Sequence, residues 1–319
     1  MKGRKSLVLA AVLVFTVAAL LFAGCSFSGG GSKTSKETAE KVTYPLTLKD
    51  ASGREVKIEK EPARIVSLTP SNTEIIFALG LGDKLVGVTK WDKYPPEVKN
   101  KKVVGDLNPS AEKVMELNPD LVVASPSLNK NAVEALRQAG VTVLTVEANT
   151  MADVNDSIML IAKATNRVEE GKKLIAKIDA KIKEITEKVA KVKKEERPRV
   201  FIEVGSEPLF TAGKNTYLHD LVEKAGGINV AADVNSWAQY SEEKVVEKNP
   251  DVIIATEGYY IPDLKEKIKA RPGWQNIKAV KENRIVTDID PDLINHPGPR
   301  VAEALEAVAK ALYPQLFQK

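Results

Sequence analysis

Residues 110–124 read SAEKVMELNPDLVVA, and residues 241–255 read SEEKVVEKNPDVIIA. The two stretches are identical at nine of fifteen positions, with an offset of 131 residues. Each pattern predicts a short helix, a break at Asn-Pro-Asp and a buried strand. The offset is much longer than the period of a solenoid repeat, so it indicates a duplicated domain rather than a repeat array.

The sequence on either side of these stretches alternates between expected strands and expected helices. Residues 217–225 are expected to form a helix that ends at Gly226. The runs at residues 121–124 and 252–255 are apolar throughout, which is typical of parallel strands covered on both faces. Further short, β-rich apolar runs predict strands at residues 64–68, 84–88, 141–146 and 199–204. The expected fold is therefore α/β, with two Rossmann-like lobes that each contain a central parallel sheet.

A long helix is expected between the two halves. Over residues 168–194, apolar side chains recur at spacings of three and four, and no proline occurs before Pro198. At 1.5 Å per residue this segment would span roughly 40 Å, so we expect one stiff bridging helix. The alternative is a coiled-coil dimerisation helix. The heptad fit is loose at Gly171 and lasts for under four heptads, so a monomer is favoured.

The N-terminus predicts export. Residues 1–5 are basic, residues 7–22 are mainly apolar, and Cys25, the one cysteine, follows Ala23-Gly24. This pattern resembles a bacterial lipobox, in which the cysteine is lipidated after cleavage; an uncleaved anchor is the alternative. The expected parts are a lipoprotein signal peptide (1–24), a flexible lipid-anchored tether (25–45), an N-terminal lobe (46–166), the bridging helix (167–195) and a C-terminal lobe (196–319).

Composition excludes several classes of protein. The 319 residues include 47 Lys and Arg against 43 Asp and Glu, and three of the basic residues lie in the signal peptide, so a nucleic-acid binder is not expected. One cysteine and two histidines do not provide a dedicated metal site. No Gly-x-Ser-x-Gly, Walker A or dinucleotide fingerprint occurs in a suitable context, so we expect neither an enzyme nor an intrinsic cofactor.

Aromatic residues gather in the connecting segments. Aromatic side chains make up 5% of the chain, yet these segments contain Trp91, Tyr94, Trp237, Tyr240, Tyr259 and Tyr260. In open α/β sheets, ligands bind outside the carboxyl ends of the strands. Aromatic loops at this position favour a large, partly apolar ligand.

Five motifs carry a resemblance to a known family: Pro70-Ser-Asn-Thr-Glu-Ile, Tyr94-Pro-Pro, the doubled Glu-Lys-Val…Asn-Pro-Asp, Arg271-Pro-Gly-Trp274 and Pro297-Gly-Pro-Arg-Val301. Together they resemble the iron-chelate/vitamin B12 class of ABC-importer substrate-binding proteins, and the similarity covers most of residues 46–317. It implies the class III periplasmic-binding-protein fold and delivery of ligand to a permease dimer driven by a cytoplasmic ATPase. It also implies a site on the outer face of the bacterial cell membrane, periplasmic in a Gram-negative cell.

The resemblance gives a role to one glutamate in each repeat. Ser110 and Ser241 are expected to be N-caps, which places Glu112 and Glu243 in the first turn of each helix. The helix dipole alone favours acids there. In the family, the matching glutamates dock onto the permease. Glu74 has a local explanation, because Ser71 and Glu74 fit a capping box.

The resemblance implies a corrinoid of the vitamin B12 type as ligand, with ferric siderophore or haem as the alternative and a ligand-sensing role also open. Relatives often carry Arg where His296 stands, and a neutral His weakens the case for an anionic siderophore. His296 or Tyr94 is a candidate axial ligand to the metal of the bound chelate. The expected ligand-binding residues are Pro70, Ser71, Asn72, Trp91, Tyr94, Gly105, Asp106, Trp237, Tyr259, Asp292 and His296.

Overall fold

The computed structural model describes residues 41–318. The expected signal peptide, the lipidation site Cys25 and most of the tether lie outside these residues. No helix in the described part of the chain is long and apolar enough to cross a membrane.

The first half of the described chain contains a five-stranded parallel sheet in the order β5-β4-β3-β6-β7. Its strands are β3 (Ile65–Ser67), β4 (Leu85–Thr89), β5 (Lys102–Gly105), β6 (Leu121–Ala124) and β7 (Val143–Thr145). Strands β3 and β6 are buried along their whole length because helices cover both faces of the sheet, whereas the edge strand β5 exposes Lys102 and Val103. The helices are α1 (Pro70–Ala78), α2 (Ala111–Met115), α3 (Lys130–Gln138) and α4 (Met151–Ala164). An antiparallel pair, β1 (Leu46–Lys49) and β2 (Glu55–Ile58), precedes them.

The second sheet is mixed, which corrects the expectation of a parallel sheet in each lobe. Its order is β11-β9-β8-β12-β13, with β10 also paired to β8. Strand β9 runs antiparallel to β8 because the chain turns back at Glu207 and Pro208, and β11 pairs antiparallel with β9 on its other side. The strands are β8 (Arg199–Ser206), β9 (Leu209–Ala212), β10 (Ile228–Asn229), β11 (Trp237–Gln239), β12 (Val252–Ala255) and β13 (Ile285–Val286). The helices are α6 (Tyr217–Lys224), α7 (Glu242–Lys248), α8 (Leu264–Lys269), α9 (Lys278–Lys281), α10 (Pro291–Ile294) and α11 (Val301–Leu312).

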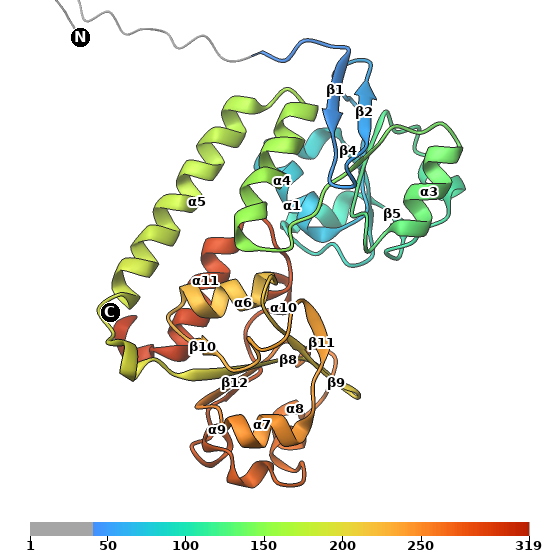
Figure 1. Ribbon diagram of the computed structural model, residues 1–319. Coiled ribbons are helices and arrows are strands. Elements are labelled where there is room, and N and C mark those ends of the chain that lie inside the picture. The colour runs from blue at the N-terminus through green and yellow to red at the C-terminus, as the bar shows by residue number, and fades with distance from the viewer. Residues whose placement is uncertain (1–40, 319) are drawn as a thin grey trace, which may run out of the picture. The chain divides into compact units, whose positions relative to one another are not determined.

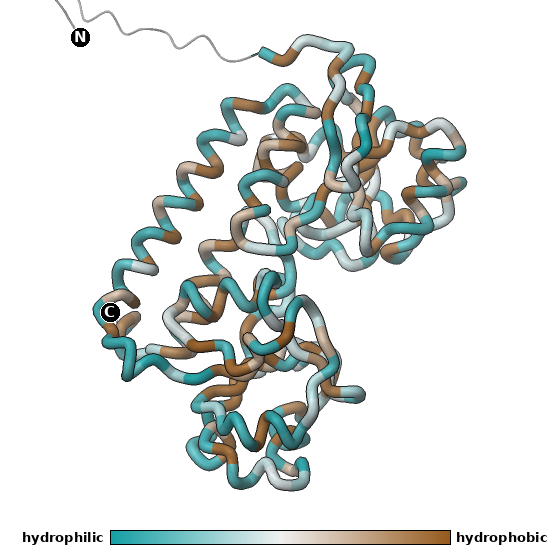
Figure 2. Tube along the Cα trace, viewed as in Figure 1, coloured by the Kyte–Doolittle hydropathy of each residue, from teal (hydrophilic) through white to brown (hydrophobic). Residues whose placement is uncertain are grey.

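The long helix α5 (Val168–Val189) connects the two halves. Figure 1 shows it beside α4 at one end and near α11 at the other, and residues of α5 contact both helices. It ends before residue 194, and a short 3-10 helix (Lys194–Glu196) follows. Hydrophobic and hydrophilic bands alternate along α5 in Figure 2, and Ile178 and Ile185 are buried against the body.

One hydrophobic core continues through both halves. It contains Ile75 and Ile158 from the first half, Ile178 from α5, and Leu221 and Leu305 from the second. A core that is shared in this way resists rotation of one lobe against the other, because opening would expose packed apolar surface. We therefore expect the two sheets to keep nearly the same relative position when a ligand enters.

Candidate functional site

A cavity of about 280 Å³ lies where the two halves meet. The carboxyl ends of β3, β6 and β7 supply one wall, and residues of α6, β11 and the segment after α10 supply the other. Of the expected ligand-binding residues, Pro70, Ser71, Trp237 and His296 line it. The structure therefore brings together residues that are up to 226 positions apart in the chain. The other lining residues include Ser125, Ser127, Leu128, Glu147, Asn149, Tyr217 and Asn295.

Helix α1 begins differently from the sequence prediction. Pro70 is its first residue and Thr69 its N-cap, and no side chain caps it, so the capping box of Ser71 and Glu74 is wrong. Proline is well suited to the first turn because it has no amide hydrogen to satisfy there. Glu74 instead points into the interior, where its side chain is 1% exposed.

Glu74 binds a cation from the other half of the molecule. Arg300 donates from Nε to Oε2 over 2.8 Å and from Nη2 to Oε1 over 2.7 Å, which is a bidentate pair. His296 Nδ1 lies 3.3 Å from Oε1 of the same carboxylate. The Arg300 guanidinium also lies 4.0 Å from the centre of the Tyr94 ring. This cluster connects α1 to the segment that precedes α11.

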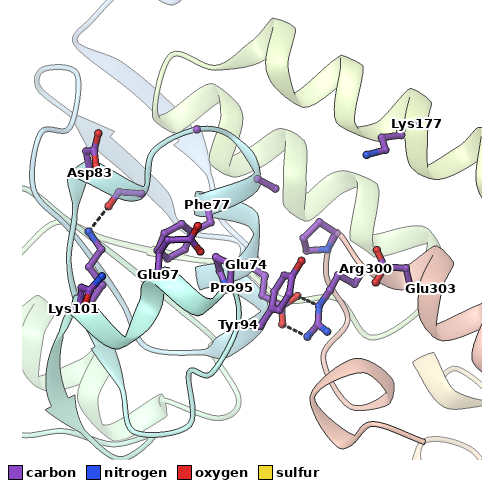
Figure 3. A pocket seen from close by; sticks show the side chains of 15 residues that line it. Glu74, Phe77, Asp83, Tyr94, Pro95, Glu97, Lys101, Lys177, Arg300 and Glu303 are labelled. Atoms are coloured by element: carbon purple, nitrogen blue, oxygen red, sulfur yellow. Dashed lines mark hydrogen bonds and ion pairs between the residues drawn. The ribbon is translucent and has the colours of Figure 1, made fainter.

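Tyr94 and Arg300 line a second cavity of about 650 Å³, into which Lys177 of α5 and Glu303 of α11 also project. Figure 3 shows this cavity, with dashed lines between Arg300 and Glu74. Tyr94 and His296, the two axial-ligand candidates, thus line different cavities. The structure does not bring them together on one cavity.

Trp91, Asp106 and Lys90 form an exposed cluster on the first half. The Trp91 indole donates a hydrogen bond to Asp106 Oδ1, and Lys90 Nζ lies 2.7 Å from Asp106 Oδ2. These hydrogen bonds to Lys90 and Trp91 hold the pKa of Asp106 at about 2. Gly105 precedes it with φ of +142°, a conformation that favours glycine. Asp106 therefore fixes the Trp91 ring in the structure as described.

The remaining expected residues are spread more widely. Tyr259 is 54% exposed and packs edge-on against Tyr260, with ring centres 4.6 Å apart. Asp292 Oδ2 lies 3.9 Å from Lys93 Nζ across the two halves. Asn72 is buried, and its Nδ2 has no hydrogen-bond partner within the described residues. It belongs to α1 and does not line the cavity wall formed by Pro70 and Ser71.

Sequence reasoning missed Glu147, which lines the cavity between the halves. Its Oε1 accepts a hydrogen bond from Ser125 Oγ over 2.9 Å and another from Ser127 Oγ. Ser125 follows β6 and Glu147 follows β7, so both stand at the carboxyl ends of adjacent strands. Each of these two residues directly follows an expected strand, and this position in the sequence could have identified them as candidates for the ligand site. Glu147 also borders a neighbouring hollow of about 290 Å³, together with Asp156.

A buried acidic pair in the second half was also missed. Arg271 donates to both oxygens of Glu203 over 2.6 and 2.7 Å, and Ser206 Oγ lies 2.9 Å from both Glu203 and Glu257. Burial and the Glu203 carboxylate raise the pKa of Glu257 to about 7. Two carboxyl groups this close disfavour a second negative charge.

The two repeated glutamates lie in the first turns of α2 and α7, as the sequence predicted, and the structure shows that both are exposed. Ser110 and Ser241 are the N-caps, and each accepts a hydrogen bond from the amide three residues on. Ser241 Oγ also donates to Glu243 over 2.7 Å. The pKa of Glu112 is held below its usual range by hydrogen bonds from the Glu112 backbone and from Ser110. The pKa of Glu243 is lowered in the same way, by hydrogen bonds from Ser241 and from the Glu243 backbone. Both carboxylates are therefore ionised and accessible at neutral pH.

The described residues contain no group of three or more His, Cys, Asp or Glu side chains that could hold a metal ion.

Known proteins with similar sequences and structures cover nearly all of the chain. The uncharacterised ABC transporter substrate-binding lipoprotein YvrC of Bacillus subtilis is 42% identical over 95% of this chain and 96% of its own length. A cobalamin-binding protein of Halobacterium salinarum is 32% identical over 85% of this chain and 75% of its own length. The solved structure of the periplasmic haem-binding protein RhuT from Roseiflexus is 30% identical and covers 79% of this chain and 98% of that one, with a TM-score of 0.70.

The family model described as periplasmic binding protein matches residues 65–292, which include the two larger sheets and most of the residues that line the cavity between them. The match, the two-sheet architecture and the inter-lobe cavity agree with one another, and the chain belongs to the periplasmic binding protein family.

Proposed function

We propose that this chain is the substrate-binding lipoprotein of an ABC importer and that it captures a corrinoid between its two lobes. The observation that carries the proposal is the cavity of about 280 Å³ formed by residues of both halves at the carboxyl ends of the strands. It contains exposed Trp237, whose indole offers flat, rigid contact area for a macrocycle. The cavity is smaller than a corrinoid, so one edge of the ligand enters it and the ring lies across its mouth.

The similarity to a substrate-binding lipoprotein of an ABC transporter supports a role in transport. The relatives include the substrate-binding lipoprotein YvrC and the cobalamin-binding protein of Halobacterium. The shared core of the two lobes fits a carrier that offers one docking surface with and without ligand. Lipidation of Cys25 would hold this carrier at the outer face of the membrane, where the permease takes up the ligand.

Two exposed glutamates supply the proposed docking surface. Glu112 and Glu243 occupy equivalent positions in the two repeats, at the starts of α2 and α7. A pair of equivalent carboxylates matches a partner with two equivalent subunits. A permease dimer with basic side chains at the matching positions is such a partner.

An absorbance titration tests the proposed ligand. Purified full-length protein is mixed with dicyanocobinamide, cyanocobalamin, haemin and a ferric trihydroxamate, and unbound ligand is removed by gel filtration. We expect the corrinoid spectrum to elute with the protein. Elution of every corrinoid without the protein would refute this ligand.

Haem is the second candidate, and His296 is the observation that favours it. His296 lines the inter-lobe cavity, and RhuT, a structural neighbour, is a haem-binding protein. An imidazole nitrogen that is free of the Glu74 contact can coordinate iron. Co-elution of haemin, and a change in its absorbance bands that disappears in His296→Ala, would select this candidate over the corrinoid.

A further inference from the structure

The cavity between the lobes has an unusual balance of charge. Its described lining includes one carboxylate, Glu147, and one histidine, His296, but neither lysine nor arginine. Within residues 41–318, no Lys, Arg or His forms an ion pair with Glu147. Arg300 follows His296 by four residues, but it lines the other cavity. Its guanidinium forms a bidentate pair with Glu74 instead.

The Glu147 carboxylate is held in a fixed direction. Ser125 and Ser127 both donate their hydroxyl hydrogens to Oε1. The Ser125 hydroxyl oxygen in turn accepts the backbone amides of Ser127 and Leu128, over 3.2 and 3.0 Å. This network fixes the two hydroxyls, and within residues 41–318 no hydrogen bond uses Glu147 Oε2. An ionised carboxylate accepts hydrogen bonds and cannot donate one.

These observations define what the cavity can accept. A carboxylate or catecholate of a ligand would lie beside Glu147 with no lysine or arginine to balance the two charges, and this arrangement is repulsive in a partly desolvated site. A neutral N–H donor would instead form a charge-assisted hydrogen bond to Glu147. Primary amides provide such donors without a charge.

We propose that Glu147, held by Ser125 and Ser127, is a specificity residue that selects ligands with a neutral, amide-bearing edge and rejects anionic chelates. This inference rests on the proposed function, because it places the edge of the transported chelate in the inter-lobe cavity. Corrinoids carry peripheral primary amides, whereas haemin carries two propionates. The same residue therefore distinguishes the two candidate ligands.

The test compares binding of dicyanocobinamide and of haemin to wild type, Glu147→Gln and Asp156→Asn, each as the full chain. Asp156 is an exposed acid that borders the neighbouring hollow and not the inter-lobe cavity, so its variant removes the same charge without touching the proposed contact. We expect Glu147→Gln to bind cobinamide about tenfold more weakly, because a charge-assisted hydrogen bond to a carboxylate becomes a weaker one to a neutral amide oxygen. We also expect it to bind haemin more tightly, and Asp156→Asn to match wild type for both ligands.

Each outcome separates this inference from the proposed function. If wild type retains cobinamide and Glu147→Gln changes neither affinity by more than about twofold, the role of Glu147 is refuted while the corrinoid carrier stands. Equal shifts in Glu147→Gln and Asp156→Asn would also refute it, since they show a general charge effect. If wild type retains haemin but no corrinoid, the corrinoid proposal is refuted. In that case, the role of Glu147 in rejecting anions is refuted as well if Glu147→Gln binds haemin no more tightly than wild type. Equal thermal midpoints for the three proteins show that each is folded.

Discussion

Removal of Arg300 should destabilise the protein far more than removal of a surface cation. The Arg300 and Glu74 side chains are 10% and 1% exposed, and their two hydrogen bonds are 2.7 and 2.8 Å long. Arg300→Met would leave the Glu74 carboxylate buried beside the imidazole of His296. Breaking a buried pair by removing one partner costs about 3–5 kcal/mol of unfolding free energy. For a body of this size, that lowers the thermal midpoint by roughly 6–10 °C.

A double-mutant cycle shows whether the pair is responsible. Glu74→Met alone strands the guanidinium and should cost a similar amount, whereas the double variant replaces both charges with apolar side chains. We expect the double variant to lie within about 1–2 kcal/mol of wild type, because paired burial of charge carries its own desolvation cost. Urea unfolding followed by circular dichroism provides the free energies.

The matched control is the exposed pair of Lys183 and Glu187, which are 3.8 Å apart with side chains 76% and 67% exposed. Lys183→Met should cost less than about 1 kcal/mol. If Arg300→Met costs no more than this control, or if the double variant loses the sum of the two single losses, the buried pair does not stabilise the contact between the lobes as argued.

Three further results are expected. Charge reversal at both Glu112 and Glu243 should abolish uptake into cells while ligand affinity measured with purified protein stays unchanged; normal uptake by the double variant would remove the docking role. Because the folded-state pKa of Glu257 is about 7 against its ordinary 4.5, this group makes the protein less stable as pH rises between these values, and the loss is complete above pH 7. Glu257→Gln should flatten that part of the stability profile and be more stable relative to wild type at pH 8 than at pH 4, and parallel profiles would contradict the raised pKa. Trp237→Ala should weaken binding of the ligand at least tenfold with an unchanged thermal midpoint, since the ring is 50% exposed; unchanged binding would place the ligand elsewhere.

Much of the fold followed from short-range pattern. The expected strands at residues 64–68, 84–88 and 121–124 correspond to β3, β4 and β6, because fully buried parallel strands leave uninterrupted apolar runs. The N-caps Ser110 and Ser241 were predictable because a cap depends on the backbone amides of the next three residues. The antiparallel strand β9 was missed. Its pairing with β8 depends on a tight turn, and the spacing of apolar residues does not reveal the direction in which the chain leaves that turn.

The candidate site was less predictable from the chain alone. Glu74 fits a local capping box, yet its partner is Arg300, 226 residues away. The predicted cap failed because a bidentate guanidinium competes for the same carboxylate. Tyr94 and His296 were both candidates for the axial ligand, but their rings line different cavities. The buried pair of Glu74 and Arg300 connects the two lobes between α1 and α11.

The sequence by itself determined the duplicated α/β architecture, the long connecting helix, the family, and the pair of exposed glutamates at matching helix starts. These features depend on hydrophobic period, capping and repeated motifs, all of which act within a few residues. Only the tertiary structure decided which charges are neutralised and which remain available. It pairs Arg300 with Glu74 and Arg271 with Glu203, and among residues 41–318 it provides no ion-pair partner for Glu147 beside the inter-lobe cavity. Charge pairing in a folded protein depends on distance in space and on burial, and the order of residues along the chain specifies neither.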